Sequence, residues 1–407
     1  MAYNYFQLDN GIRIIHKQTT SSVSHVGLVV NTGTRDELPN EKGIAHFIEH
    51  IIFKGTHKRN TYQVLSYLEN VGGELNAYTT KEETFFYASV LDNYIEKAIE
   101  ILADIVFNST FYDKDIDTER DVVKEEIQLC KDTPSEWIFD EFENQIFNGH
   151  PLGTNILGTL QSLKTINREK VLNFTQRTYN TNQMVLSIVC QSSFEKIKKI
   201  TSKFLSNIPK QERNFKRSVF TDYKPSTRHI KLRSNQSHAI IGSILPAYDE
   251  RNNQIATLLL NILGGQGLNS RLGMAIREKK GYVYNIEANY SPMSDIGLYT
   301  IYIGCDYKNV EKCFVLIEKE LDKLKNTKLG TLQLYRARKQ LIGQMAITYD
   351  ANLTEMLSIG KNHLIFNEVE PINEICKKIE TITAEELINL ANEIFNNQNI
   401  SKLIIGK

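Results

Sequence analysis

GIAHFIEHIIFKGTHKRN, residues 43–60, places two histidines and a glutamate inside an otherwise apolar helical pattern. On a helix, His46, Glu49 and His50 share one face because they are spaced i, i+3 and i+4. Two imidazoles one turn apart can both reach a single Zn²⁺ at about 2.1 Å, and the carboxylate between them then lies beside the ion, where it can take a proton from water. Two histidines packed in the core are the alternative, but burying three such groups without a metal or partners costs free energy. The stretch therefore predicts a catalytic metal helix.

A second segment, DKDIDTERDVVKEEIQLCKD, offers a further metal ligand. Glu119 and Glu126 are two helical turns apart, on the same face as Val122 and Val123, whereas Glu125 falls off that face. We therefore expect Glu126 to bind the metal and Glu119 to orient a ligand or the water from behind. Taken alone, this acidic helix is typical of a charged surface helix. Because residues 43–60 supply two histidines and a glutamate, we interpret the acidic helix as part of the same metal site.

Composition gives no support for several other classes of protein. Lys+Arg and Asp+Glu balance at 48 each, so the charge gives no indication of a nucleic-acid or anionic-membrane partner. No apolar run is long enough to cross a membrane, and the N-terminal residues do not resemble a secretory signal. The 5 cysteines form no CxxC pair, which favours free thiols in a reducing compartment. We expect a cytoplasmic protein without nucleic-acid or membrane partners.

The two halves of the chain repeat a pattern. SHVGLVV begins at Ser24 and SHAIIGSI at Ser237, each after a short strand-like segment. Residues 163–190 and 379–406 both run from Thr-Ile into an amphipathic helix, an Asn-rich turn and an apolar strand. Helix-then-strand segments look alike in many proteins, but the order and spacing are kept at both ends of the halves, which favours a duplication.

The duplication predicts an α+β fold of two homologous domains, each an antiparallel sheet covered by helices. We place a catalytic zinc-binding domain at residues 1–206 and a homologous domain without zinc at 227–407. Residues 207–226 are polar and contain two prolines, which suits a linker.

HFIEH, followed downstream by ERDVVKEE, closely resembles the pitrilysin and insulysin family of inverted zinc peptidases, in particular its bacterial and mitochondrial-processing-peptidase branch. The resemblance covers essentially the whole chain, and further matching segments are DNGIRII, VGGELNAYTTKEET, HPLGTNILGT and SRLGMAIREKKGYVY. It implies one Zn²⁺ per chain, held by His46, His50 and Glu126, with Glu49 as the general base. Glu119 would be the second acid of the family's paired-glutamate motif.

Two further parts of the site follow from the same resemblance. REKKGYVY is similar to a family segment whose arginine and tyrosine reach the active site from another domain, which implies Arg277 and Tyr284. The adjacent Tyr282 leaves open which tyrosine serves. Asn76 and Ala77 would belong to an edge strand that pairs with the substrate backbone; a plain hairpin is nearly as consistent with the residues.

The resemblance also implies an assembly. Larger relatives enclose the substrate between four such domains, and two are present here, so this chain would be half of a clamshell completed by dimerisation. We expect a zinc-dependent endopeptidase that hydrolyses unfolded peptides inside a homodimeric chamber. The alternatives are a proteolytically idle zinc-binding subunit and a peptide-binding partner in a hetero-oligomeric processing peptidase.

Overall fold

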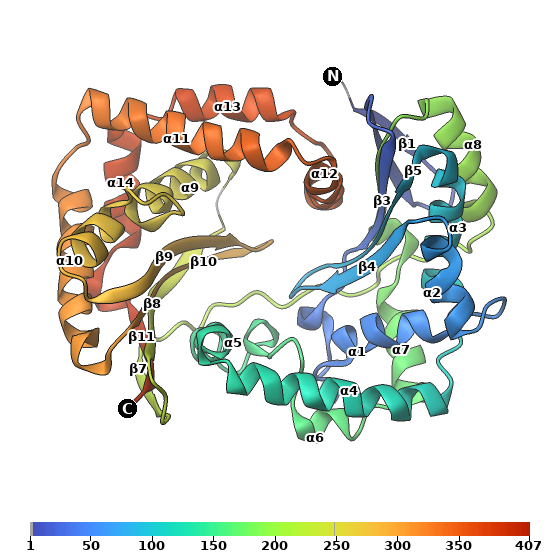
Figure 1. Cartoon of the computed structure of the whole chain (residues 1–407), viewed down its shortest axis with the longest axis horizontal. Helices are drawn as coiled ribbons and strands as arrows, with labels where there is room; N and C mark the ends of the chain where they lie inside the picture. Colours follow the sequence, from blue (N-terminus) through green and yellow to red (C-terminus); the bar gives the residue numbers. More distant parts are fainter. Residues whose placement is uncertain (1–2, 248) are drawn as a thin grey trace. The chain divides into compact units, whose positions relative to one another are not determined.

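A computed structural model describes residues 3–247 and 249–407, and these form two compact units, each built on one β-sheet (Figure 1). The first unit combines the segment that ends at Gln128 with Thr154–Arg217 and Ile347–Pro371. The second combines Leu129–Gly153, Ser218–Ala346 and Ile372–Lys407.

The sheet of the first unit is mostly antiparallel, with one parallel pair between β2 and β6 among the described strands. Most of its strands alternate buried apolar side chains between two faces, so both faces need a cover. In spatial order the strands are β1 (Asn4–Gln7), β2 (Arg13–Gln18), β6 (Met184–Cys190), β3 (Val23–Val30), β5 (Thr84–Leu91) and β4 (Glu74–Thr79).

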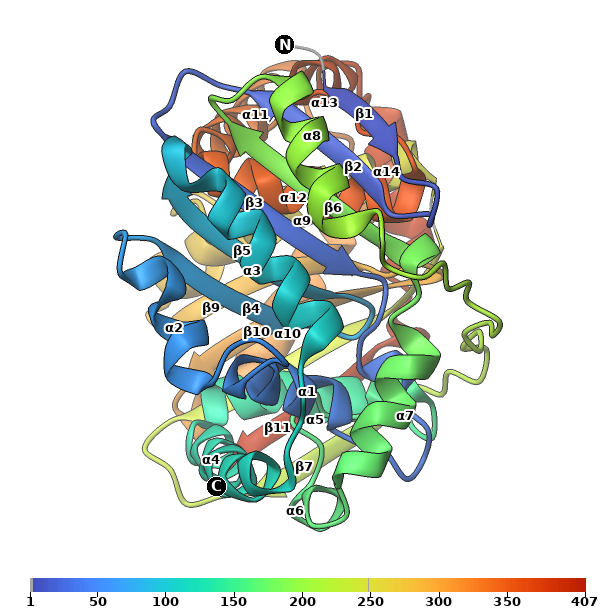
Figure 2. The ribbon, with the colours of Figure 1, turned by 90° about the vertical axis from the view of Figure 1, so that its right-hand side faces the viewer.

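Helices cover both faces of this sheet. Figure 2 shows α3 (Ile95–Asn108) and α8 (Phe194–Leu205) lying across one face, and α12 (Asn352–Phe366) packs on the other, against β3 and β6 (Figure 1). The unit also contains α1 (Ile44–Ile51), α2 (Thr61–Glu69), most of α4 (Asp113–Asp132), α6 (Leu160–Leu163) and α7 (Arg168–Thr178).

The second unit repeats this plan. Its strands follow the order β7 (Thr227–Lys231), β11 (Ser401–Gly406), β8 (Ser237–Pro246), β10 (Ile296–Cys305) and β9 (Val283–Pro292), and β7 and β11 form its parallel pair. One face carries a core shared with α9 (Glu250–Gly264), α10 (Val310–Asn326) and α14 (Ala384–Ile394), and α5 (Pro134–Ile146) packs on the other. The helices α11 (Thr331–Tyr349) and α13 (Ile372–Glu380) complete the longer elements.

Shorter turns of helix connect these elements. They are η1 (Thr34–Asp36), η2 (Ile52–Lys54), η3 (Asp92–Tyr94), η4 (Pro151–Gly153), η5 (Thr181–Gln183), the π-helix η6 (Gly273–Glu278), η7 (Tyr307–Asn309) and η8 (Asn397–Asn399).

The predicted fold class is confirmed. Strands β2-β6-β3-β5-β4 of one sheet and β7-β11-β8-β10-β9 of the other have the same order and the same parallel pair, as a duplication requires. The two repeated Ser-His segments lie in β3 and β8, and the two repeated helix-to-strand segments form α7–β6 and α14–β11.

The compact units differ from the predicted ranges 1–206 and 227–407 by an exchange of helices. The helix α5 comes from the first half of the sequence but packs on β8 and β11 of the second unit. The helix α12 comes from the second half but packs on β3 and β6 of the first. Most of the predicted linker, up to Arg217, belongs to the first unit.

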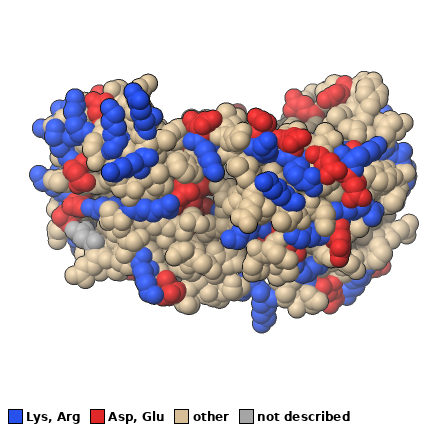
Figure 3. Space-filling view, turned by 90° about the horizontal axis from the view of Figure 1, so that it is seen from below, with Lys and Arg blue, Asp and Glu red and all other residues tan. Residues whose placement is uncertain are grey.

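Two further observations concern the character of the helices and the surface charge. No helix within the described residues combines the length and the apolar character that a membrane span requires. Basic and acidic side chains are interspersed over the face drawn in Figure 3, as the balanced charge of the chain suggests.

Candidate active site

The helix α1 holds the three polar residues of the predicted metal helix on one side and buries its apolar side chains on the other. His46 is buried, with 7% of its surface exposed, whereas Glu49 and His50 are half-buried. The helix begins after Gly43, whose φ of 83° is the left-handed conformation that glycine adopts readily. A Cβ at Gly43 would also lie 2.7 Å from the carbonyl oxygen of Leu157, so a larger residue does not fit.

Glu126 of α4 meets the two histidines of α1. Its Oε2 lies 3.4 Å from His50 Nε2, and its Oε1 lies 3.7 Å from His46 Nε2. The three donor atoms lie within 4.8 Å of one another. A tetrahedral ion with bonds of about 2.1 Å separates neighbouring donors by about 3.4 Å, so these residues fit a zinc ion.

Glu119 lies behind His50, as expected from its position two turns before Glu126. The Nδ1–H of His50 donates a hydrogen bond of 2.8 Å to Glu119 Oε1. Lys54 forms an ion pair with the other oxygen of Glu119, at 2.6 Å. Because the ionised carboxylate can only accept, it fixes the proton on Nδ1 and leaves the lone pair of Nε2 for a metal.

The pKa values of the two histidines are shifted in opposite directions. Burial and the neighbouring charge of His50 lower the pKa of His46 to about 4. Burial also acts to lower the pKa of His50, but hydrogen bonds to Glu119 and Glu126 and their charges raise it to about 9. A hydrogen bond from His50 lowers the pKa of Glu126. Without a metal at neutral pH, one protonated imidazole therefore lies between carboxylates, and a zinc ion would take the place of that proton.

Glu49 differs from the other acids of the site. Burial raises its pKa above the ordinary value, against the lowering effects of Thr79 and His50. A carboxylate that ionises closer to neutral pH is suited to accept a proton and give it back.

A pocket of about 360 Å³ adjoins the metal ligands. Asn76 and Ala77 line it together with Glu49 and His50, so these predicted residues lie beside the metal helix. They belong to β4, the edge strand of the sheet, whose outer side pairs with no described strand. The remaining lining residues are Phe53, Lys54, Thr61, Leu65, Leu75 and Glu119.

Comparison with known proteins identifies the family. Residues 13–160 match the model of the insulinase family, peptidase family M16, and residues 165–341 match the model of the peptidase M16 inactive domain. An uncharacterized zinc protease of Rickettsia bellii is 33% identical over 406 residues, which covers 99% of this chain and 97% of that protein. The chain belongs to peptidase family M16.

Other relatives and solved structures extend this result. An uncharacterized zinc protease of Bacillus subtilis is 29% identical to the M16 chain, covering 98% of it and 97% of the relative. The fold is similar to that of a peptidase M16 inactive domain from Pseudomonas fluorescens, with a TM-score of 0.92 at 17% identity over 100% of this chain and 98% of that one. A protease from Helicobacter pylori gives a TM-score of 0.90 at 18% identity, covering 100% and 99% of the two chains.

The remaining predicted residues of this M16 chain lie in the second unit. Arg277 is at the end of η6, where its Nε forms an ion pair with Glu278 Oε1 at 3.1 Å. Tyr284 is 64% exposed, whereas Tyr282 packs partly against the core with the Lys312 ammonium 5.3 Å from its ring centre. Of the two tyrosines, Tyr284 is the one with a largely exposed side chain.

Lys54 and Glu37 were not identified from the sequence. Lys54 follows His50 by four residues, so helical spacing could have placed it near the site. Glu37 accepts hydrogen bonds from the backbone N–H groups of Gly43 and Ala45 at 2.9 and 3.0 Å. Nothing in the sequence pattern indicates these contacts of Glu37, because they depend on how the loop before α1 folds back.

Proposed function

We propose that this chain is a zinc-dependent endopeptidase that hydrolyses unfolded peptides. The observation that carries the proposal is the convergence of His46, His50 and Glu126 at ligand spacing, with Glu49 on the same helix outside the ligand set. The names of the Rickettsia bellii and Bacillus subtilis relatives, both zinc proteases, support it.

Bound zinc would supply a Lewis acid that polarises the scissile carbonyl and lowers the pKa of water. Glu49 accepts the proton of the attacking water and passes it to the leaving amine, for which its raised pKa is favourable. Glu119 holds His50 in the tautomer that presents Nε2.

The substrate would bind as an extended strand along the free edge of β4. Because successive residues of a strand direct their N–H and C=O groups to opposite sides, one of Asn76 and Ala77 pairs with the peptide through its backbone in this mode. The pocket between β4 and α1, with Phe53, Leu65 and Leu75 among its walls, would take one substrate side chain.

We also propose that the active form is a homodimer in which Arg277 and Tyr284 complete the partner's site. A cation and a phenol can both donate hydrogen bonds to the carbonyl oxygen as its negative charge grows in the transition state. The exposed side chain of Tyr284 is consistent with this role.

The deciding experiment compares wild type with Glu49→Gln in the cleavage of a quenched, unstructured peptide after zinc loading. We expect the variant to lose at least about a hundredfold in kcat, because the general base is missing. Zinc binding should be retained, since Glu49 is not a ligand. Equal cleavage by both proteins would place the activity elsewhere and contradict the proposal.

Zinc affinity provides a second comparison, between Glu126→Gln and Glu125→Gln. Both lie on α4 and make the same chemical change, but Glu125 is exposed and away from the ligands. We expect only Glu126→Gln to weaken zinc binding, measured by competition with a chelator. If wild type binds zinc but cleaves no peptide, alone or with a second subunit, the alternative of an idle zinc-binding subunit is favoured.

A further inference from the structure

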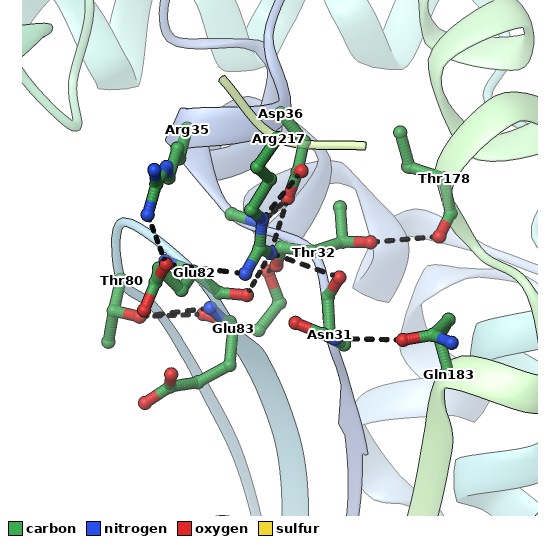
Figure 4. Close-up of polar contacts among 12 residues, drawn as sticks. Asn31, Thr32, Arg35, Asp36, Thr80, Glu82, Glu83, Thr178, Gln183 and Arg217 are labelled. Atoms are coloured by element: carbon green, nitrogen blue, oxygen red, sulfur yellow. Dashed lines mark hydrogen bonds and ion pairs between the residues drawn. The ribbon is translucent and has the colours of Figure 1, made fainter. Parts of the chain in front are cut away.

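Four charged side chains lie together in the first unit, and three of them, Arg35, Asp36 and Glu82, are buried (Figure 4). Arg35 pairs with Glu82 at 2.7 Å, and Arg217 pairs with Asp36 at 2.7 Å. The side chain of Asp36 is 0% exposed and that of Arg217 is 12% exposed. Arg217 comes from the segment predicted as a linker, far from α1 in sequence.

The guanidinium of Arg217 connects three separate parts of the unit. Its Nε and Nη2 donate to Asp36 Oδ1 and Oδ2 at 2.9 and 2.7 Å. Nη2 also donates to the backbone carbonyls of Glu82, at 2.7 Å, and Asn31, at 3.2 Å. One side chain thus joins η1, the turn between β4 and β5, and the end of β3. Such a multidentate contact is specific to arginine, because lysine cannot provide the planar fork.

The residue after Asp36 reaches the metal helix. Both oxygens of Glu37 accept backbone N–H groups of the first turn of α1, those of Gly43 and Ala45. The N-cap residue, Gly43, has no side chain that could do this. His46 directly follows Ala45, so the carboxylate of Glu37 fixes the turn of helix that carries the first metal ligand.

The metal helix needs such support because it is short. It has 8 residues, and isolated helices below about 12 residues are marginal in water. The direction of α1 therefore depends on what holds its ends. Residues 36 and 37 are adjacent, and η1, which ends at Asp36, is further fixed by Arg35 N–H donating to the carbonyl of Lys81.

We propose that Arg217 is a positioning residue for the metal helix, acting through Asp36 and Glu37 on the first turn of α1. The segment between the two sequence halves is then part of the support of the active site rather than a passive connection. The inference rests on the proposed function only where zinc binding is measured.

The test uses Arg217→Lys in the full chain, with Arg213→Lys as a matched control. The lysine keeps a positive charge beside the buried Asp36, so the variant does not leave that carboxylate unpaired. Arg213 lies in the same segment and also contacts the carbonyl of Asn31, but none of its hydrogen bonds reaches Asp36 or Glu82. Circular dichroism and thermal unfolding establish that both variants are folded.

Hydrogen exchange of the Gly43 and Ala45 amides in the metal-free protein is the first measurement. We expect Arg217→Lys to exchange these amides about tenfold faster than wild type through local opening, and Arg213→Lys to leave them unchanged. If Arg217 anchors only the linker, Arg217→Lys will speed exchange at residues 211–217 but not in α1. That result would overturn the inference. Because no metal is needed, this result stands whether or not the proposed peptidase activity is found.

Zinc affinity and kinetics form the second measurement. We expect Arg217→Lys to weaken zinc binding by about tenfold, as removal of groups that orient metal ligands does, and to lower kcat with little change in KM. The variant Glu37→Gln should give the same effects, and adding Arg217→Lys to it should cause little further loss. Fully additive losses, or wild-type zinc affinity in Arg217→Lys, would contradict action through Glu37.

Discussion

The protonation of His50 links metal binding to pH at the scale of a single residue. Its pKa of about 9 means that the imidazole is protonated at neutral pH before zinc binds. Zinc requires the free lone pair, so binding must release that proton. At pH 7 we predict the release of about one proton per zinc, and an apparent affinity that rises with pH until about pH 9.

Calorimetry in two buffers of different ionisation enthalpy measures this release. The fold stability of the metal-free protein gives an independent check. The pKa of His50 is raised from 6.5 in the unfolded chain to about 9, so its contribution is fully present below pH 6.5 and is lost as the pH rises through 9. Zinc binding without proton release at pH 7 would show that His50 is neutral beforehand and contradict the pairing with Glu119 and Glu126.

At the scale of elements, the close packing of α12 on the sheet depends on Gly360. A Cβ on Gly360 would lie 2.6 Å from Ser187 Oγ and 2.8 Å from the ring of Phe85. We therefore predict that Gly360→Ala destabilises the protein by about 1–3 kcal/mol, because helix and sheet must separate to admit the methyl group.

Gly343 in α11 provides the matched control for this substitution. It is also a helical glycine, but an added Cβ there meets nothing within 4 Å. Gly343→Ala should stabilise the fold by about 0.4–1 kcal/mol, because alanine loses less backbone entropy on folding. Denaturant unfolding of the two variants measures the difference. Stabilisation by both would mean that α12 does not pack closely on β6.

The helices also show how far prediction from the sequence reaches. Residue spacing predicted the helix α1 and the placement of Glu119 and Glu126 on one face of α4, since helical geometry fixes which side chains share a face. On α4, Val122 and Val123 were expected to share the face of Glu119 and Glu126, but Val122 is exposed whereas Val123 is buried. Apolar periodicity shows that a helix has a buried side but not which sheet covers it, so the exchange of α5 and α12 could not be predicted.

Long-range polar contacts were also beyond prediction. Arg217 lies in a polar stretch that suits a linker, and only the fold brings it to Asp36. Similarly, the resemblance implied Tyr284 but left open whether Tyr282 serves instead, and only the structure shows that Tyr282 packs partly against the core while Tyr284 is exposed. Tertiary structure decides such cases because the partners are far apart in the chain.

At the scale of the whole molecule, the single metal group found among the described residues lies in the first unit, and Arg277 and Tyr284 lie in the second. Mixing two inactive variants tests whether one chain's second unit serves another chain's metal site. Glu49→Gln lacks the general base, and Arg277→Met lacks the proposed cation. Each should be inactive alone, with zinc bound.

If sites are completed by the partner, a mixed dimer contains one intact site, built from Glu49 of one chain and Arg277 of the other. Random exchange of subunits should then restore about a quarter of wild-type activity, because half of the dimers are mixed and each has one working site of two. Completion within one chain predicts no recovery, since every site then lacks one group. Light scattering establishes that dimers form, and a monomer with full activity would contradict the proposed assembly directly.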